Sequence, residues 1–253
     1  MTASAPRDTV RVGVFIPQTV QLLDLACVDI IGTMSYEYLS VLRLVPAAMY
    51  NLAPSVKIHF IGSVQRGELI ELTTGIKIAC THHFSDPEVK AGELDVVIVP
   101  GPDPDVAFDP AAMAWLAAQG ACEGTDILSV CSGIYLCGTA GLLKGRQACG
   151  PRMMQSELKA KFEGVTWVGD EYRWMQDGNF WSGGGVTNGN DLVSAYVRHS
   201  PKFPAPLAEF GLSVTETGDR SQKYEVGQAR FTATALWNII RAALMGLTRR
   251  KQD

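Results

Sequence analysis

The sequence predicts an α/β fold in which helices cover both faces of a doubly wound, mostly parallel sheet. Short apolar runs alternate with segments of helical periodicity in units of roughly 30 to 40 residues, which is typical of strand–helix–strand repeats. The chain has 253 residues, of which 47% are hydrophobic and 19% are charged. We therefore expect one domain over residues 1–253, with a core at about 10–200 and a loop and helix extension at 201–253.

The amino-terminal part begins with an apolar run at Val10–Ile16, which is typical of a buried parallel strand. A helix is expected from near Asp24 to Leu42, because apolar residues recur there at three- and four-residue steps. Residues 56–61 predict a second strand. The segments 69–72 and 76–79 flank a polar turn that contains a glycine, and this pattern indicates an added hairpin.

Two more apolar strands are predicted in the middle of the chain, at residues 95–99 and 127–130, with a helix at 110–119 between them. A further helix follows the second of these strands. The remaining part is predicted to contain four short strands, three helices and an ordered surface loop. The strands are 147–149, 165–168, 172–175 and 179–182, the helices are 153–162, about 191–198 and 231–247, and the loop is 200–228.

Composition excludes several classes of function. The formal net charge is -4 without a basic stripe, which argues against a nucleic-acid partner. Residues 1–9 lack the apolar core of a secretory signal, and no apolar run reaches the roughly 18 residues of a membrane span. The six cysteines show neither a Cys-x-x-Cys pair nor zinc spacing. We expect a cytoplasmic protein with reduced thiols, no disulfide, no metal and no cofactor.

Cys131 is the main candidate for a reactive residue. It stands where a short buried strand stops, and Ser132 and Gly133 open the next helix. Such a turn exposes the sulfur, often strains the backbone and can lower the pKa of the thiol. The alternative is a buried cysteine that merely begins a helix. In a parallel sheet, the loops 17–24, 100–105 and 131–133 would meet at the carboxyl ends of their strands, where ligands bind.

Three segments resemble the ThiJ/PfpI superfamily, whose flavodoxin-like sandwich is shared with class I glutamine amidotransferases. They are Val99-Pro100-Gly101, the run Ser129–Gly133 followed by Ala140–Gly145, and the run Gly184–Asp191. Within that superfamily, Gln21–Leu25 is similar to a pattern of the isonitrile hydratase branch.

The resemblance implies that Cys131 is the nucleophile and that Asp24 faces its sulfur as the acidic partner. A simple helix cap is the other role open to Asp24. Asp29 is expected to be structural, because it lies about 140° further around an ideal helix. The resemblance also implies substrate-binding or oxyanion-stabilising roles for another set of residues. These residues are Gly101, Ser132, Gly133, Thr187 and Asn188.

Two prolines depart from the family pattern. Pro102 stands where relatives commonly offer the N–H of a second glycine to an oxyanion. Either Gly101 or Asp103 supplies the donor instead, or the oxyanion hole is incomplete. Pro151 stands where many relatives carry a histidine. Arg152 beside it either binds an anion, pairs with a carboxylate or is solvated. His59 is expected to be structural, and His82 and His83 are expected at the surface. Without a Cys–His pair, protease or amidotransferase chemistry is not expected.

Three functions are consistent with these residues. The first is a cysteine-dependent enzyme that hydrates a small apolar electrophile, an isonitrile by resemblance, through Cys131 and Asp24. The second keeps the fold but acts on another electrophile or specialised metabolite, in the manner of a glyoxalase. The third is a redox-sensing or ligand-binding protein without turnover, because an accessible thiolate oxidises readily. The expected partners are a small-molecule substrate and a second copy of the chain, as relatives are commonly homodimers.

Overall fold

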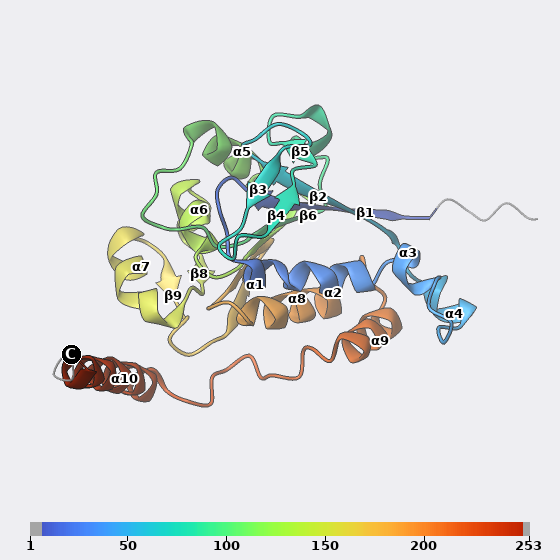
Figure 1. The fold of residues 1–253 in the computed structure, drawn as a ribbon. Coiled ribbons are helices and arrows are strands. Elements are labelled where there is room, and N and C mark those ends of the chain that lie inside the picture. Colours follow the sequence, from blue (N-terminus) through green and yellow to red (C-terminus); the bar gives the residue numbers. More distant parts are fainter. Residues whose placement is uncertain (1–6, 250–253) are drawn as a thin grey trace, which may run out of the picture.

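A seven-stranded sheet forms the centre of the protein, seen in a computed structural model that describes residues 7–249 (Figure 1). The strand order is β10-β11-β7-β6-β1-β2-β5, and every neighbouring pair is parallel except β10 with β11. The predicted mostly parallel α/β fold is confirmed. The strands of this sheet are β1 (Thr9–Ile16), β2 (Ser55–Gly62), β5 (His82–His83), β6 (Val96–Val99), β7 (Asp126–Ser129), β10 (Trp174–Asp177) and β11 (Phe180–Gly183).

Side chains of the central strands alternate between two apolar cores. In β6, Val96 and Ile98 join one core while Val97 and Val99 join the other, because successive side chains of a strand point to opposite faces. All four side chains are fully buried. This explains why the central strands are continuous apolar runs in the sequence.

Helices cover both faces of the sheet, as predicted (Figure 1). One core includes α1 (Leu22–Leu25), α2 (Cys27–Thr33), α8 (Asn188–His199) and α9 (Ala205–Thr215). The other includes α5 (Pro110–Gly120), α6 (Gly133–Thr139) and α7 (Gln155–Lys161). The predicted hairpin is the pair β3 (Leu69–Glu71) and β4 (Lys77–Ala79), and β8 (Gln147–Ala148) pairs with β9 (Thr166–Trp167). The remaining short elements are α3 (Tyr36–Leu39), α4 (Ala47–Tyr50), and the 3₁₀ helices η1 (Pro87–Val89) and η2 (Arg152–Met154).

The single helix predicted from Asp24 to Leu42 is instead three short helices. The chain turns at Ala26 between α1 and α2, and it leaves the helical conformation at Ser35 before α3. Ser35 has extended dihedral angles of φ -81° and ψ 150°, and its side chain accepts a hydrogen bond from the Tyr38 N–H. A serine in this role begins a new helix rather than continuing an old one. The periodic apolar residues therefore mark a buried face but not an unbroken axis.

The expectation of a surface loop at residues 200–228 is wrong, because α9 occupies residues 205–215. Leu207, Ala208, Gly211 and Leu212 are buried, and the helix packs against α2 and α8. Pro204 and Pro206 lie at its amino-terminal end, where a missing N–H costs nothing. The prolines begin this helix rather than preventing it.

His82 also differs from its predicted surface position. It lies in β5, which pairs with the end of β2, and only 5% of its area is exposed. Its ring meets that of His59 edge-on with the centroids 4.5 Å apart. Both histidines are remote from Cys131 in the sheet order, on the far side of β1 and β6.

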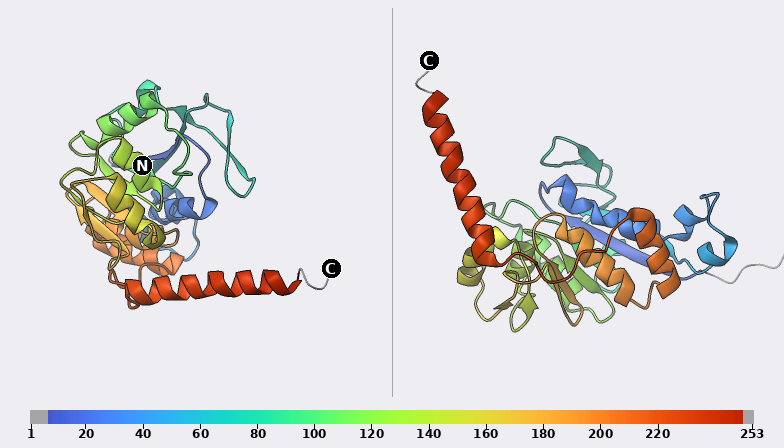
Figure 2. Two further views of the ribbon diagram at one scale, coloured as in Figure 1. Left: turned by 90° about the vertical axis from the view of Figure 1, so that its left-hand side faces the viewer. Right: turned by 90° about the horizontal axis from the view of Figure 1, so that it is seen from below.

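The predicted final helix is α10 (Gln228–Arg249), which extends away from the rest of the molecule (Figure 2). Leu236, Trp237 and Ile240 are among its exposed apolar side chains. Across the described part of the chain, no helix combines the length and apolarity that a membrane span requires.

Replacing Leu212 by alanine tests the packing of α9. Because this side chain is 2% exposed, Leu212→Ala should lower the free energy of unfolding by about 2–5 kcal/mol in urea denaturation. Val214→Ala is the control, because Val214 on the same helix is 43% exposed. This substitution should change the free energy of unfolding by less than about 0.5 kcal/mol. Equal small effects would mean that α9 does not pack on the core.

Candidate active site at the carboxyl ends of the central strands

Cys131 follows β7 in a left-handed backbone conformation, with φ 55°. Such a conformation is uncommon for residues other than glycine and is found at turns or strained sites. The Cys131 N–H donates to the carbonyl of Gly184 at 3.2 Å, and α6 begins two residues later. A Cβ added to Gly133 would lie 2.0 Å from the Val99 carbonyl oxygen, so glycine is required for this close approach. The sharp strand-to-helix turn expected around Cys131 is present.

Asp24 reaches the same place from α1 and is 1% exposed. Its Oδ2 accepts a hydrogen bond of 3.0 Å from the Gly101 N–H, in the loop after β6. Its Oδ1 is buried and has no ordinary hydrogen-bond partner in the described structure. The predicted meeting of the loops that follow β1, β6 and β7 therefore occurs, with Asp24 and Cys131 next to each other.

Burial controls the ionisation of this pair. Desolvation raises the pKa of Asp24 to about 6, and the Gly101 N–H and the Cys131 side chain only partly offset it. Desolvation, with the negative charge of Asp24 second, raises the pKa of Cys131 above its ordinary value. This direction is opposite to the lowering expected from the turn. Near pH 7 the carboxylate is thus mostly ionised beside a protonated thiol, which makes Asp24 a base for Cys131.

Two backbone N–H groups act on the sulfur, and one of them was not foreseen. The N–H groups of Val186 and Ser132 partly offset the rise in the pKa of Cys131. Val186 is held at φ 25°, which is unusual for a β-branched residue. The only sequence signal was the three glycines before it, which allow the loop to approach closely.

Gly101 and Ser132 were expected to bind substrate or to stabilise an oxyanion, but both donate hydrogen bonds within the protein. The Gly101 N–H is taken by Asp24, so Gly101 positions the acid rather than presenting a free donor. A Cβ at Gly101 would lie 2.7 Å from Asp24 Oδ2. The Ser132 hydroxyl donates to the Pro102 carbonyl at 2.7 Å. Pro102 thus contributes an acceptor to the loop.

Thr187 and Asn188, at the start of α8, have different surroundings. Thr187 is exposed and makes no side-chain cap, and its Oγ1 accepts from Arg220 at 3.3 Å. Asn188 is buried, and its Nδ2 donates to the Tyr224 hydroxyl at 2.6 Å. Asn188 is therefore held in the interior by Tyr224, while Thr187 lies at the surface beside Arg220.

Arg152 is neither solvated nor paired with a carboxylate in the described structure. Only 9% of its area is exposed, its Nε donates to Gln228 Oε1 at 2.9 Å, and its Nη2 donates to the Val226 carbonyl at 2.9 Å. Its guanidinium also lies over the rings of Tyr224 and Phe231. Arg152 thereby joins the core to the segment before α10. This contact spans more than 70 residues of sequence, and no local pattern could have indicated it.

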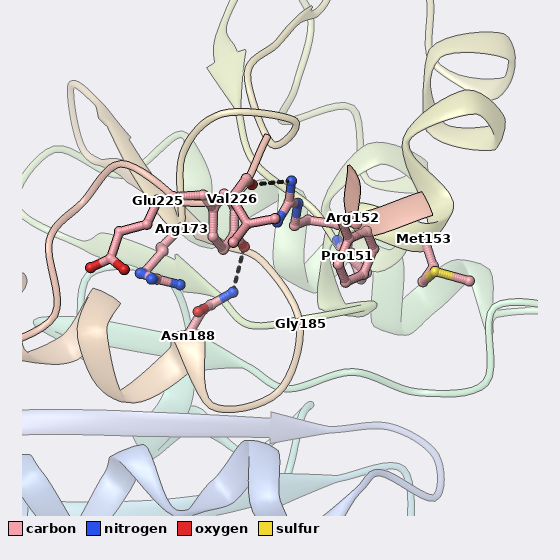
Figure 3. A pocket seen from close by; sticks show the side chains of 10 residues that line it. Pro151, Arg152, Met153, Arg173, Gly185, Asn188, Glu225 and Val226 are labelled. Carbon is pink, nitrogen blue, oxygen red and sulfur yellow. Dashed lines mark hydrogen bonds between the residues drawn. The ribbon is translucent and has the colours of Figure 1, made fainter. Parts of the chain in front are cut away.

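Two pockets adjoin the loops around Cys131. The first, called here the strand-end pocket, has a volume of about 820 Å³ and is lined by Gln18, Thr19, Gln21, Thr73, Gly101, Pro102, Asp103, Val106 and Ser132. The second, called here the arginine pocket, has a volume of about 440 Å³ (Figure 3). It is lined by Pro151, Arg152, Met153, Arg173, Gly185, Asn188, Tyr224, Glu225, Val226 and Phe231.

Replacing Asp24 by asparagine tests the electrostatic coupling. Asp24→Asn removes the negative charge beside the sulfur, so the pKa of Cys131 should fall. The pH dependence of Cys131 alkylation by iodoacetamide, followed by mass spectrometry, gives this pKa directly. Asp29→Asn is the control, because Asp29 is exposed on α2 and should leave the curve in place. If the midpoint of the pH dependence of Cys131 alkylation were the same in Asp24→Asn and the wild type, the electrostatic coupling between Asp24 and Cys131 would be refuted.

Comparisons with known proteins agree with this architecture. Residues 36–199 match the model of the DJ-1/PfpI family. The isonitrile hydratase of Pseudomonas putida is 31% identical over 144 residues, which are 55% of this chain and 58% of that protein. The chain thus covers less than two thirds of that relative. Asp24 precedes the residues matched by the family model.

Solved structures share the fold at low sequence identity. A ThiJ/PfpI family protein from Pseudomonas syringae has a TM-score of 0.66 and 20% identity over 95% of this chain and 94% of that one. An AraC family transcriptional regulator from Pseudomonas putida has a TM-score of 0.62 and 15% identity over 81% of this chain and 99% of that one. Since the family model matches well over half of the sequence, this chain belongs to the DJ-1/PfpI family.

Proposed function

We propose that the protein is a cysteine-dependent enzyme that hydrates a small, partly apolar isonitrile to an N-substituted formamide. The observation that carries this proposal is the pairing of Cys131, on its strained turn, with the buried Asp24 carboxylate. Its pKa of about 6 allows Asp24 to accept and return a proton near neutral pH. The partial match to an isonitrile hydratase supports the choice of substrate.

The first step is addition of the thiol to the terminal carbon of the isonitrile. The Asp24 carboxylate accepts the thiol proton as the sulfur attacks, and the new S–C bond forms. Asp24 then gives that proton to the same carbon, which leaves a thioimidate on Cys131. The raised pKa of Cys131 suits this step, because the thiol retains its proton until the substrate is in place.

The second step is hydrolysis of the thioimidate. Asp24 accepts a proton from water as the water oxygen attacks the carbon, and it passes this proton to the substrate nitrogen. As the C–S bond breaks, Asp24 accepts the proton of the new hydroxyl group and gives it to the leaving sulfur, so that the formamide leaves and the thiol is restored. The net reaction adds one water to one isonitrile, and neither a histidine nor an oxidant takes part. The N–H groups of Val186 and Ser132 are placed to stabilise charge on the sulfur.

The raised pKa of Cys131 also bears on the alternatives. A redox sensor needs a substantial fraction of thiolate at neutral pH, and burial beside Asp24 reduces that fraction. We therefore rank sensing below catalysis. An α-oxoaldehyde such as methylglyoxal is the second candidate substrate for Cys131 and Asp24.

Activity measurements with purified variants test the proposal. The wild type should convert an aryl isonitrile to its formamide, and Cys131→Ala should show only the background rate. Asp24→Asn should lower kcat by about 10²–10⁴-fold, the usual contribution of a general acid–base group. Cys122→Ala should retain activity, because Cys122 follows α5 at the other end of β7. Formamide formation that is equal in wild type and Cys131→Ala would exclude the mechanism.

We also propose that α10 pairs with a second copy of the chain. Ala233, Leu236, Ile240 and Ala243 recur at steps of three and four residues, which is the spacing of a seam between two helices. Leu236 is 55% exposed and Ile240 is 42% exposed. Residues 228–249 contain three arginines and no acidic residue, so the excess negative charge of the chain lies outside α10.

Light scattering after size exclusion tests the pairing. The wild type should run as a dimer, and the double variant Leu236→Glu with Ile240→Glu should run as a monomer. Thr234→Glu, on the polar side of α10, is the matched control and should remain dimeric. A monomeric wild type that floats with anionic lipid vesicles would overturn the pairing and indicate a membrane surface instead.

A further inference from the structure

The arginine pocket holds two cations around one aromatic ring. Arg152 comes from η2, and Arg173 lies just before β10 (Figure 3). Their guanidinium carbons lie 4.2 Å and 4.6 Å from the ring centroid of Tyr224. Tyr224 belongs to the segment between α9 and α10. The pocket is therefore a space between the core and this later segment, with positive charge on its wall.

Neither guanidinium has a carboxylate within ion-pair distance in the described part of the chain. Arg152 donates to carbonyl groups and to the side-chain oxygen of Gln228, all of them neutral. Arg173 donates through its Nε to the Ser221 carbonyl at 3.0 Å. Glu225 also lines the pocket, but it is exposed and forms no ion pair there. The pocket thus has an excess of positive charge.

A buried cation without a counter-ion is costly, and a ligand that supplies the negative charge would relieve this cost. Arg152 is the more buried of the two, with 9% of its area exposed. The planar guanidinium groups match the geometry of a carboxylate. The Asn188 amide and the Tyr224 hydroxyl add polar groups on the same wall, and the rings of Tyr224 and Phe231 with Val226 add apolar surface. This combination suits an anion attached to an apolar body.

One short loop connects this pocket with the reactive sulfur. The Gly184 carbonyl accepts the Cys131 N–H, and the Val186 N–H acts on the Cys131 sulfur. Gly185 and Asn188, in the same loop, line the pocket. A Cβ at Gly184 would lie 2.8 Å from the Tyr224 hydroxyl, so this loop and Tyr224 are in close contact. A molecule in the pocket would lie against the loop that holds the thiol.

We propose that the arginine pocket binds a carboxylate of the substrate, so that the electrophile attacked by Cys131 is an apolar molecule with an anionic group. This inference rests on the proposed function for the reacting group, but the anion site itself does not depend on it. Arg173 supplies the specificity, because its terminal nitrogens are not engaged by any carboxylate in the described structure. Arg152 both binds the anion and anchors residues 226–228.

A matched pair of substrates tests the proposal, with 4-isocyanobenzoate compared with its uncharged methyl ester. The wild type should favour the carboxylate in kcat/KM by roughly 10-fold or more, the magnitude of one charge-assisted hydrogen bond. Arg173→Gln should abolish that preference through KM, and Arg173→Lys should restore part of it. Arg230→Gln, an exposed arginine at the start of α10, is the control and should keep the preference. A wild type that uses both substrates equally overturns the inference and leaves the proposed function standing.

Equilibrium binding separates the anion site from the chemistry. Cys131→Ala cannot form the thioimidate, and calorimetry should show that it binds 4-isocyanobenzoate more tightly than the ester. Arg173→Gln in the same background should remove this difference. If no isonitrile is turned over but this binding is found, the proposed function fails while the anion site stands. Benzoate should inhibit turnover competitively. Binding of benzoate without competition would place a separate anionic ligand in the pocket and overturn the assignment to the substrate.

Discussion

The hydrogen bond from the Gly101 N–H to Asp24 is the interaction on which the site depends. It connects the loop after β6 with the helix after β1, and it holds a buried carboxylate beside Cys131 at the end of β7. The parallel sheet makes this contact possible, because the carboxyl ends of its neighbouring strands lie at one edge. The absence of a side chain at Gly101 lets the backbone approach the acid. The contact therefore ties the geometry of the sheet to the charge next to the thiol.

Burial gives this pair a chemistry different from that of a thiolate–imidazolium pair. In the latter, opposite charges stabilise each other and the thiol ionises early. Here two acids share a desolvated space, so the pKa of each is raised and a proton is retained between them. A substrate that must gain a proton on the atom attacked by sulfur is suited to this arrangement. Pro151, on the wall of the arginine pocket, supplies no group that titrates.

The segment between α9 and α10 lies outside the residues that the family model matches, and it packs against the core. Its attachment depends on Arg152, which stacks on Tyr224 and Phe231 and bonds to Val226 and Gln228. One side of the arginine pocket is consequently made by residues outside the stretch that the family model matches. Under the proposed substrate binding, this segment supplies one wall of the site, whereas the loop around Cys131 belongs to the stretch that the family model matches.

Local features of the sequence determined every strand of the central sheet except β5, together with the turn at Cys131 and the helix at the carboxyl end, because apolar runs and periodicity reflect burial directly. Asp24 was found through its position after the first strand and a family resemblance. The break at Ser35, the helix formed by residues 205–215 and the environment of Arg152 were decided only by the tertiary structure. Each depends on partners distant in the sequence, as when Leu212 packs on α2 and α8 or Arg152 meets Tyr224. The tertiary structure also decided the direction of the pKa shift at Cys131, because desolvation by the surrounding fold outweighs the favourable N–H groups of the turn.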